Sequence, residues 1–229
     1  MISIKYVGLQ YTMFFEPIND IREHSSIFEK KLKEHFSSGF NILPNVENVP
    51  LEIPRMIGSN NEQKLVLSIS SNSAIVQKRA EIDDIDGEIN KVRNIIEILD
   101  GVIKSIGGKH LFSGLVIQGN LIIEQDAVEY LKEKFLNIET NDKLFDLLAK
   151  ITFVEDEKYY VNISLNNIRN IELTENKLGI ELDINDRYRY NFKKADYPYS
   201  DNNVIDKIYS ILDNVLKEKL DKLLDEGTY

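Results

Sequence analysis

The amino-acid sequence predicts an α+β fold in which one β-α-β-β-β-α unit occurs twice, in residues 1–107 and again in residues 108–229. Each half begins with a segment that alternates between apolar and smaller or polar residues, which is the period of a strand. Each half also ends with a long amphipathic helix. We therefore expect either two closely packed repeats or one continuous domain.

The first half contains the clearest helix of the chain. Aliphatic residues recur at steps of three and four from Ile82 to Ile106, and Gly107-Gly108 supplies a left-handed stop. This stripe predicts a helix that covers a sheet or a partner helix. The other elements expected in this half are a strand over residues 2–15, a helix over 21–36 capped by Asn19 or Asp20, and a hairpin of strands 65–69 and 74–79.

A proline-rich segment separates the first helix from this hairpin. Pro44, Pro50 and Pro54 exclude a helix and allow only short edge strands, of which Leu51-Glu52-Ile53 is the candidate. The run Gly58-Ser59-Asn60-Asn61 predicts a turn.

The second half repeats this order with one ambiguous segment. Residues 144–154 begin with a leucine spacing that favours a helical turn and end with Ile151-Thr152-Phe153-Val154, which favours a strand. The other expected elements are strands over 111–123, 159–165, 177–184 and 188–192, a helix that Asp126 caps and that runs to Phe135, and a final helix between Asp201 and Leu223.

Three short similarities occur in the same order in both halves. They pair Tyr6-Val7-Gly8-Leu9 with Phe112-Ser113-Gly114-Leu115, residues 32–36 with 131–135, and residues 64–69 with 177–182. The hypothesis they support is duplication, and the alternative is that amphipathic halves look alike because packing demands similar patterns. A β-α-β-β-β-α unit used twice resembles TATA-binding-protein-like folds, which implies a curved antiparallel sheet with helices on one face. Fold analogy does not establish function.

Two further features resemble a sporadically distributed bacterial protein family of unknown function. They are Pro50-Leu51-Glu52-Ile53-Pro54-Arg55 before a strand, and Leu182-Asp183-Ile184 ahead of a terminal helix. The resemblance implies an intracellular bacterial or mobile-element origin and no particular activity.

Composition excludes several classes of function. The chain has no cysteine, which removes disulfides, thiolate nucleophiles and Cys-ligated zinc. The net charge of −10 argues against general nucleic-acid binding, since neutralising phosphates needs clustered Lys and Arg. No apolar run is long enough to span a membrane, and the first residues lack the pattern of a signal peptide. We expect a cytoplasmic protein that does not bind membranes.

The best candidate for a functional surface is the segment from Arg187 to Lys194. A period of two would place Tyr188, Tyr190 and Phe192 on one face and Arg187, Arg189 and Lys193 on the other, with Lys194 following. Aromatic rings beside cations can stack on single-stranded bases, although an aromatic core strand with a basic, solvated back has the same pattern. Arg55, between Pro54 and Met56, is a second candidate that could present a guanidinium to an acidic partner; a structural loop is the alternative.

No catalytic, metal or cofactor motif is present. His24 and His35 would lie about 16 Å apart on a helix, too far to share a metal, and His110 is expected at the surface or the edge of the core. The acidic run at residues 83–88 fails the spacing of a calcium loop, and Asp183 and Asp186 are expected to make a turn between strands.

These observations lead to a ranked set of hypotheses. The first is a non-enzymatic interaction or binding module without a cofactor, whose partner is a protein or a second copy in a homodimer. The second is a nucleic-acid-associated protein that uses residues 187–194. The third is an enzyme of an unrecognised class that uses Asp183 or Asp186.

Overall fold

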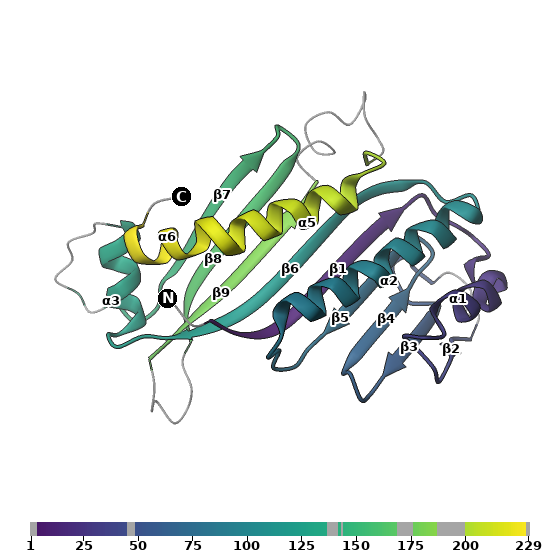
Figure 1. The fold of residues 1–229 in the computed structure, drawn as a ribbon, viewed down its shortest axis with the longest axis horizontal. Helices are drawn as coiled ribbons and strands as arrows, with labels where there is room; N and C mark the ends of the chain where they lie inside the picture. The colour runs from purple at the N-terminus through teal and green to yellow at the C-terminus, as the bar shows by residue number, and fades with distance from the viewer. Residues whose placement is uncertain are drawn as a thin grey trace.

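A computed structural model shows one nine-stranded antiparallel sheet with helices packed against it (Figure 1). It describes residues 4–44, 49–136, 142, 144–168, 176–186 and 200–227. The strands lie in the order β2-β3-β4-β5-β1-β6-β9-β8-β7. Their bounds are β1 Ile4–Phe15, β2 Phe40–Ile42, β3 Met56–Asn60, β4 Leu65–Ile69, β5 Ser73–Lys78, β6 His110–Ile122, β7 Leu148–Glu155, β8 Tyr159–Ile168 and β9 Lys177–Asn185.

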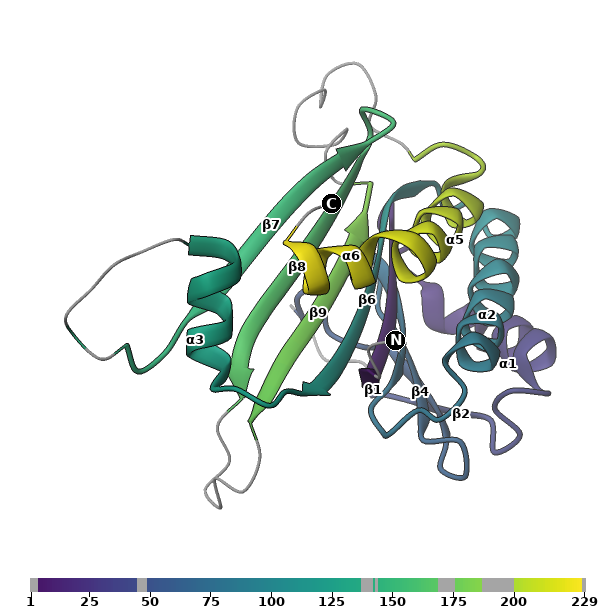
Figure 2. The same cartoon turned by 60° about the vertical axis from the view of Figure 1, so that its left-hand side comes forward.

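The two longest strands, β1 and β6, lie side by side in the middle of the sheet. Leu9 lies opposite Ile117, and Tyr11 lies opposite Leu115. Alternate residues of each strand are buried against the helices, as the two-residue period predicts. The other face of the sheet carries no described helix (Figure 2), an arrangement that antiparallel sheets tolerate when that face is polar.

The helices lie together on the opposite face (Figures 1 and 2). The long helix α2 crosses β1 and β5, while the C-terminal helices cross the second half of the sheet. Their bounds are η1 Ile21–His24, α1 Ser25–Leu32, α2 Ile85–Ser105, α3 Ala127–Leu131, η2 Lys132–Leu136, α5 Val204–Asn214, η3 Val215–Lys219 and α6 Leu220–Glu226; η1 is a 3-10 turn, and η2 and η3 are π-helical turns. Within the described ranges, no helix is both long and apolar enough to cross a membrane.

The structure confirms the α+β class, the antiparallel sheet and most of the elements expected from sequence. Asp126 caps α3 by accepting hydrogen bonds from the backbone N–H groups of Val128 and Glu129. Gly107 ends α2 in the left-handed region, with φ of 87°. The ambiguous segment forms strand β7, which begins at Leu148. The strand expected over residues 188–192 lies outside the described residues.

Two expectations for the proline-rich segment are wrong. Leu51-Glu52-Ile53 forms a turn and not an edge strand, because Ile53 N–H donates to the carbonyl of Pro50 within the segment. Residues 58–60 belong to strand β3, and the turn follows at residues 61–64. All three residues pair with β4, and Gly58 also pairs with β2, and this pairing outweighs their local turn preference.

The strand order is symmetrical about the β1–β6 pair. On each side the next strand, β5 or β9, is the last described strand of its half, and the next long helix of the chain follows it. The first two sequence similarities fall at corresponding places, in β1 and β6 and at the ends of α1 and α3. The third does not: residues 65–69 form β4, which β5 separates from β1, whereas residues 177–182 lie in β9 directly beside β6. Shared descent of the two halves stays a prediction.

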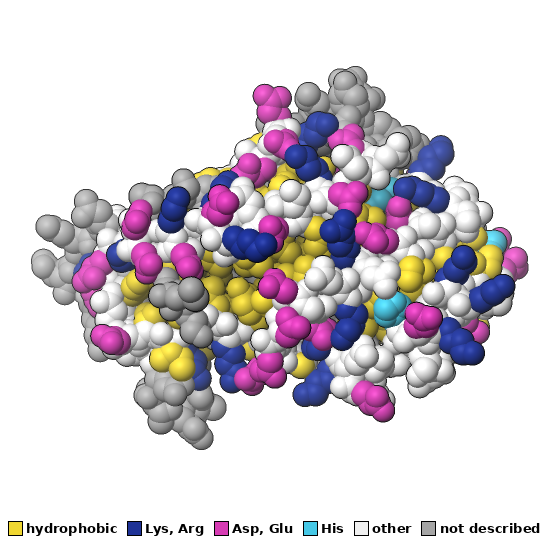
Figure 3. Space-filling model, in the orientation of Figure 1, with side chains coloured by type: hydrophobic (Ala, Val, Ile, Leu, Met, Phe, Trp, Pro, Cys, Tyr) yellow, Lys and Arg dark blue, Asp and Glu magenta, His cyan; other side chains and the backbone are white. Residues whose placement is uncertain are grey.

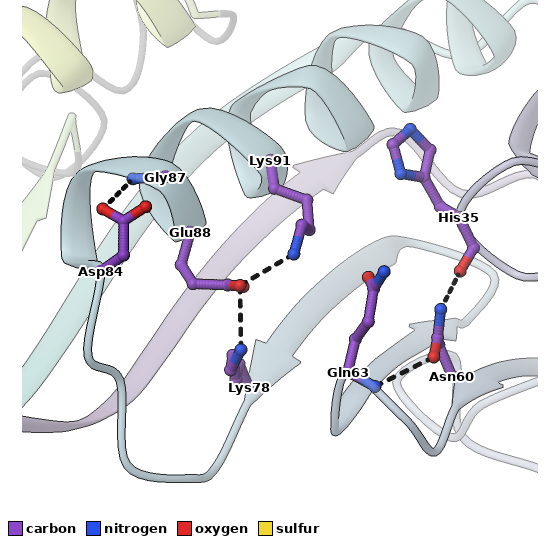
Figure 4. A network of polar contacts seen from close by, with 8 residues as sticks. All are labelled: His35, Asn60, Gln63, Lys78, Asp84, Gly87, Glu88 and Lys91. Atoms are coloured by element: carbon purple, nitrogen blue, oxygen red, sulfur yellow. Dashed lines mark hydrogen bonds and ion pairs between the residues drawn. The ribbon is translucent and has the colours of Figure 1, made fainter.

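Helix α2 is held on the sheet by ion pairs as well as by its apolar stripe. The carboxylate of Glu88 contacts the ammonium groups of Lys78 on β5 at 3.0 Å and of Lys91 at 2.8 Å (Figure 4). Asp84 caps the helix by accepting a hydrogen bond from Gly87 N–H. Burial raises the pKa of the Glu88 carboxyl, but the two ammonium groups outweigh it, and the net shift is downward.

Glu88 is therefore expected to stabilise the fold at neutral pH and not in acid. A folded-state pKa below the ordinary 4.5 means that this contribution is present above pH 4.5 and is lost as the pH falls through the lowered value. Glu88→Gln should lose about 1 kcal/mol at pH 7 and nearly nothing at pH 3. Urea unfolding of both proteins at the two pH values measures this, with the exposed Glu62→Gln as control. An equal loss at both pH values would contradict the ion-pair explanation.

Candidate functional site

A groove on the helical face runs between α2 and the C-terminal helices, with a volume of about 680 Å³. Figure 3 shows apolar side chains exposed at the bottom of this hollow, with acidic side chains around it. We call it the α2–α5 groove. Its lining residues are Tyr6, Ile85, Asp86, Ile89, Asn90, Arg93, Asp206, Tyr209, Ser210, Leu212, Asp213, Leu216 and Lys217.

The groove exists because the apolar stripes of α2 and of the C-terminal helices are wider than the part of the sheet that they cover. Ile85 and Ile89 extend the α2 stripe toward the start of the helix, ahead of Val92, its first fully buried residue. Leu216 extends the stripe of the C-terminal helices in η3. All three side chains are only partly buried against the core. They leave an apolar strip between two helices, which is the geometry that accepts an amphipathic partner helix.

Arg93 and Tyr209 form the polar end of the groove. The guanidinium carbon of Arg93 lies 5.5 Å from the centre of the Tyr209 ring, within cation–π range. The same guanidinium forms ion pairs with Glu97 at 2.8 Å and with Asp206 across the groove. Tyr209 also stacks on Tyr11, with 5.9 Å between ring centres and 11° between planes. Burial raises the pKa of both tyrosines, so both remain neutral phenols.

The rim of the groove is acidic. Asp86, Asp206 and Asp213 face only two cations, Arg93 and Lys217. Lys217 already pairs with Asp213 at 2.6 Å, and Arg93 with Asp206. Asp86 makes no ion pair within the described part of the chain. Burial first, and then the negative charges of Asp221 and Asp86, raise the pKa of Tyr6 at the groove floor. Repulsion of a phenolate is the signature of a negative local potential.

A second polar cluster lies inside the protein, where β6 begins and β9 ends. His110 Nε2 lies 2.7 Å from Ser113 Oγ, and His110 Nδ1 lies 3.5 Å from the Asp100 carboxylate. Asp186 accepts hydrogen bonds from Ser113 N–H at 2.7 Å and from Ser200 Oγ at 2.5 Å. Ser200 N–H in turn donates to the carbonyl of His110. We call these five residues the His110 cluster.

The His110 cluster contains a serine beside a histidine, the residue types of a nucleophile and its general base. This serine and this histidine are buried, however, and the cluster connects elements of the fold. Ser113 is 0% exposed and His110 is 8% exposed. Neither residue lines the α2–α5 groove, so a substrate there cannot reach the hydroxyl. Burial raises the pKa of the Asp186 carboxyl, although hydrogen bonds from Ser200 and Ser113 oppose the shift. The cluster joins α2, β6, the end of β9 and the residue that leads into α5. Sequence reasoning missed it, because its members are separated by up to 100 residues.

The two acidic candidates of the sequence do not form one site. Asp183 lies within β9, where it accepts hydrogen bonds from Asn162 and Asn185, and Asp186 follows that strand in the His110 cluster. The turn expected at residues 183–186 is thus mostly strand. Burial raises the pKa of the Asp183 carboxyl as well. In the ranges that the structure describes, no three His, Asp or Glu side chains are grouped to hold a metal ion.

The sequence-predicted interaction residues fall into two groups. Arg187, Tyr188, Arg189, Tyr190, Lys193 and Lys194 lie outside the described residues. Arg55 is described: its guanidinium donates to the carbonyls of Val49 at 3.1 Å and Pro50 at 3.2 Å, and its backbone N–H donates to Ile69. Arg55 therefore closes its own loop onto β4. A role for it in binding an acidic partner stays a prediction.

The comparisons with known proteins do not name a family. No protein-family model matches the chain, and no curated protein matches it. Among solved structures, the chain is similar to the TBP of Methanococcus jannaschii at 15% sequence identity and a TM-score of 0.32. That likeness covers 94% of this chain and 99% of the other.

Proposed function

We propose that this chain is a non-enzymatic protein-interaction module whose α2–α5 groove binds an amphipathic, basic helix of a partner protein. The observation that carries the proposal is an apolar floor of Ile85, Ile89 and Leu216 beside a rim with more carboxylates than cations. Apolar side chains of a helix would cover this floor, and its flanking Lys or Arg would meet Asp86. The net charge of −10 would speed the approach of such a partner.

The groove also offers a rigid anchor for the partner. That anchor is Arg93, whose side chain is 38% exposed and is held by the carboxylates of Glu97 and Asp206. Tyr209 is only 5% exposed and supports the Arg93 guanidinium without itself offering a contact surface. An Arg side chain that is already ordered loses little freedom on binding, and Arg is one of the residue types that dominate binding energy in protein interfaces.

The test uses a synthetic helical peptide of Leu and Lys in amphipathic spacing and a second peptide with Glu in place of each Lys. We expect fluorescence anisotropy at physiological ionic strength to show at least about tenfold tighter binding of the Lys peptide. Ser210→Arg places a long cation in the groove at an exposed position and should weaken that binding by about tenfold or more. Val66→Arg adds the same charge on the open face of the sheet and should leave it within about twofold. Equal losses in both variants would show general charge attraction and overturn the proposal.

The two symmetrical halves support a further part of the proposal, that both descend from one ancestral β-α-β-β-β-α unit. The symmetrical strand order and two of the three sequence similarities favour it. Nucleic-acid binding through residues 187–194 and the bacterial family resemblance remain predictions.

A further inference from the structure

The two ends of the sheet differ in how they are protected. At one end lies β2, which has only three residues and is followed by Pro44. Very short edge strands and prolines are the devices by which sheets avoid pairing with other chains. At the other end lies β7, which has eight residues and pairs with β8 alone among the described strands (Figure 1). An edge strand of that length is a template for a further strand.

Strand β7 is also apolar where an edge strand is normally charged. Leu148 is 64% exposed and Val154 is 46% exposed. Both lie opposite polar positions of β8, Asn166 and Tyr160, on the face of the sheet away from the helices. Ala149, Ile151 and Phe153 alternate with them and pack toward the core. Between Leu148 and Val154 the strand carries one charge, on Lys150.

We propose that two copies of this chain form a homodimer by antiparallel pairing of β7 with β7, with Ile151 on the two-fold axis. The occupant of this edge is a second copy because the strand is complementary to itself in that register. A two-fold axis perpendicular to the sheet makes each contact occur twice and keeps the helices of both copies on one side. The dimer surface is separate from the α2–α5 groove, so each can fail without the other.

The register follows from the pattern of apolar and charged residues. With Ile151 on the axis, Leu148 of each copy lies opposite Val154 of the other, so the exposed apolar side chains cover one another twice. Lys150 then lies opposite Thr152, which is uncharged. Moving the axis to Lys150 would bring two ammonium groups face to face, which destabilises a cross-strand pair.

The first measurement is the solution mass of the full chain by light scattering. We expect a dimer for the unaltered protein and for Leu51→Lys, and a monomer for Leu148→Lys. Both substitutions replace an exposed leucine by lysine, at 40% exposure in the loop and 64% at the edge. The proposal is overturned if the unaltered protein is a monomer at a concentration of about 100 μM, or if Leu148→Lys is still a dimer.

The second measurement reads the register directly, since the chain has no native cysteine. Ile151→Cys places one thiol from each copy on the axis, where facing Cα atoms are about 4.5–5.5 Å apart and can form a disulfide. Thr152→Cys places its thiol opposite Lys150 and should not cross-link. We expect a reducible dimer band on a denaturing gel for Ile151→Cys only. Cross-linking of Thr152→Cys to the same extent, or of neither variant, contradicts the register.

Discussion

Replacing Asp186 by Ala is expected to lower the free energy of unfolding by about 2–5 kcal/mol, because the buried hydrogen bonds of two partners are lost. The Ser113 N–H is fully buried and has the Asp186 carboxylate as its acceptor at 2.7 Å. Ser200 Oγ donates to the same carboxylate at 2.5 Å. Ala leaves both donors unpaired, and it also removes the contact that joins β9 to the start of α5. Chemical denaturation at pH 7, followed by circular dichroism, measures the loss.

Asp186→Asn is the matched control for this variant. The amide oxygen can still accept the Ser113 hydrogen bond, and the side chain keeps its size. Burial raises the pKa of Asp186, so the protonated form stabilises the fold at low pH, and that stabilisation is lost as the pH rises through the folded-state value. The neutral Asn does not depend on pH in this way. We expect Asp186→Asn to cost less than about half as much as Asp186→Ala at pH 7. Equal losses would show that a neutral acceptor of the same size rescues nothing, which would contradict the hydrogen-bond explanation.

Truncating Leu99 in the middle of α2 is expected to have a similarly large effect, a loss of about 2–5 kcal/mol for Leu99→Ala. Leu99 is 0% exposed and lies on the stripe that covers the centre of the sheet. Its removal leaves a cavity that a rigid sheet below and a continuous helix above cannot close. With a total stability of about 5–15 kcal/mol for an ordinary domain, this single change would lower the thermal midpoint markedly.

Leu51→Ala is the control for Leu99→Ala, because it removes the same atoms from a side chain that is 40% exposed in a turn. Its expected effect is within about 0.5 kcal/mol. Differential scanning calorimetry of both variants compares the two losses directly. A small loss for Leu99→Ala would mean that α2 does not pack on the sheet as described.

The elements of the fold were predictable where one local pattern was strong and nothing opposed it. Helix α2 is the best case: the apolar spacing, the carboxylates of its first turn and Gly107 all predict it, although the stripe begins at Ile82, which pairs with Tyr6 ahead of the helix. Strands β1 and β6 follow equally from alternation. Residues 58–60 show the opposite case. Gly58 and Asn60 favour a turn locally, but each forms a pair with the neighbouring strand β4 that the local pattern does not contain.

The candidate site was predictable only in part. Both aliphatic stripes that form the groove floor are visible in the sequence, but they predicted only helices that cover a sheet or a partner helix, and not a groove between them. The partnership of Arg93 with Tyr209 and Asp206 was not visible, since 113 residues separate Arg93 from Asp206. His110 was expected at the surface or at the edge of the core, and it is buried; its link to Asp186 depends on β6 lying beside β9.

The sequence by itself determined the α+β class, the position of each long helix and the absence of cysteine chemistry. Each of these depends on residue type or on a period of two or 3.6 residues, which a short stretch of chain contains. Only the tertiary structure decided that β1 and β6 lie together at the centre, that α2 and α5 leave a groove, and that β7 ends the sheet. Those features depend on which distant segments bury their apolar faces against each other, and a one-residue change of register alters them without changing any local pattern.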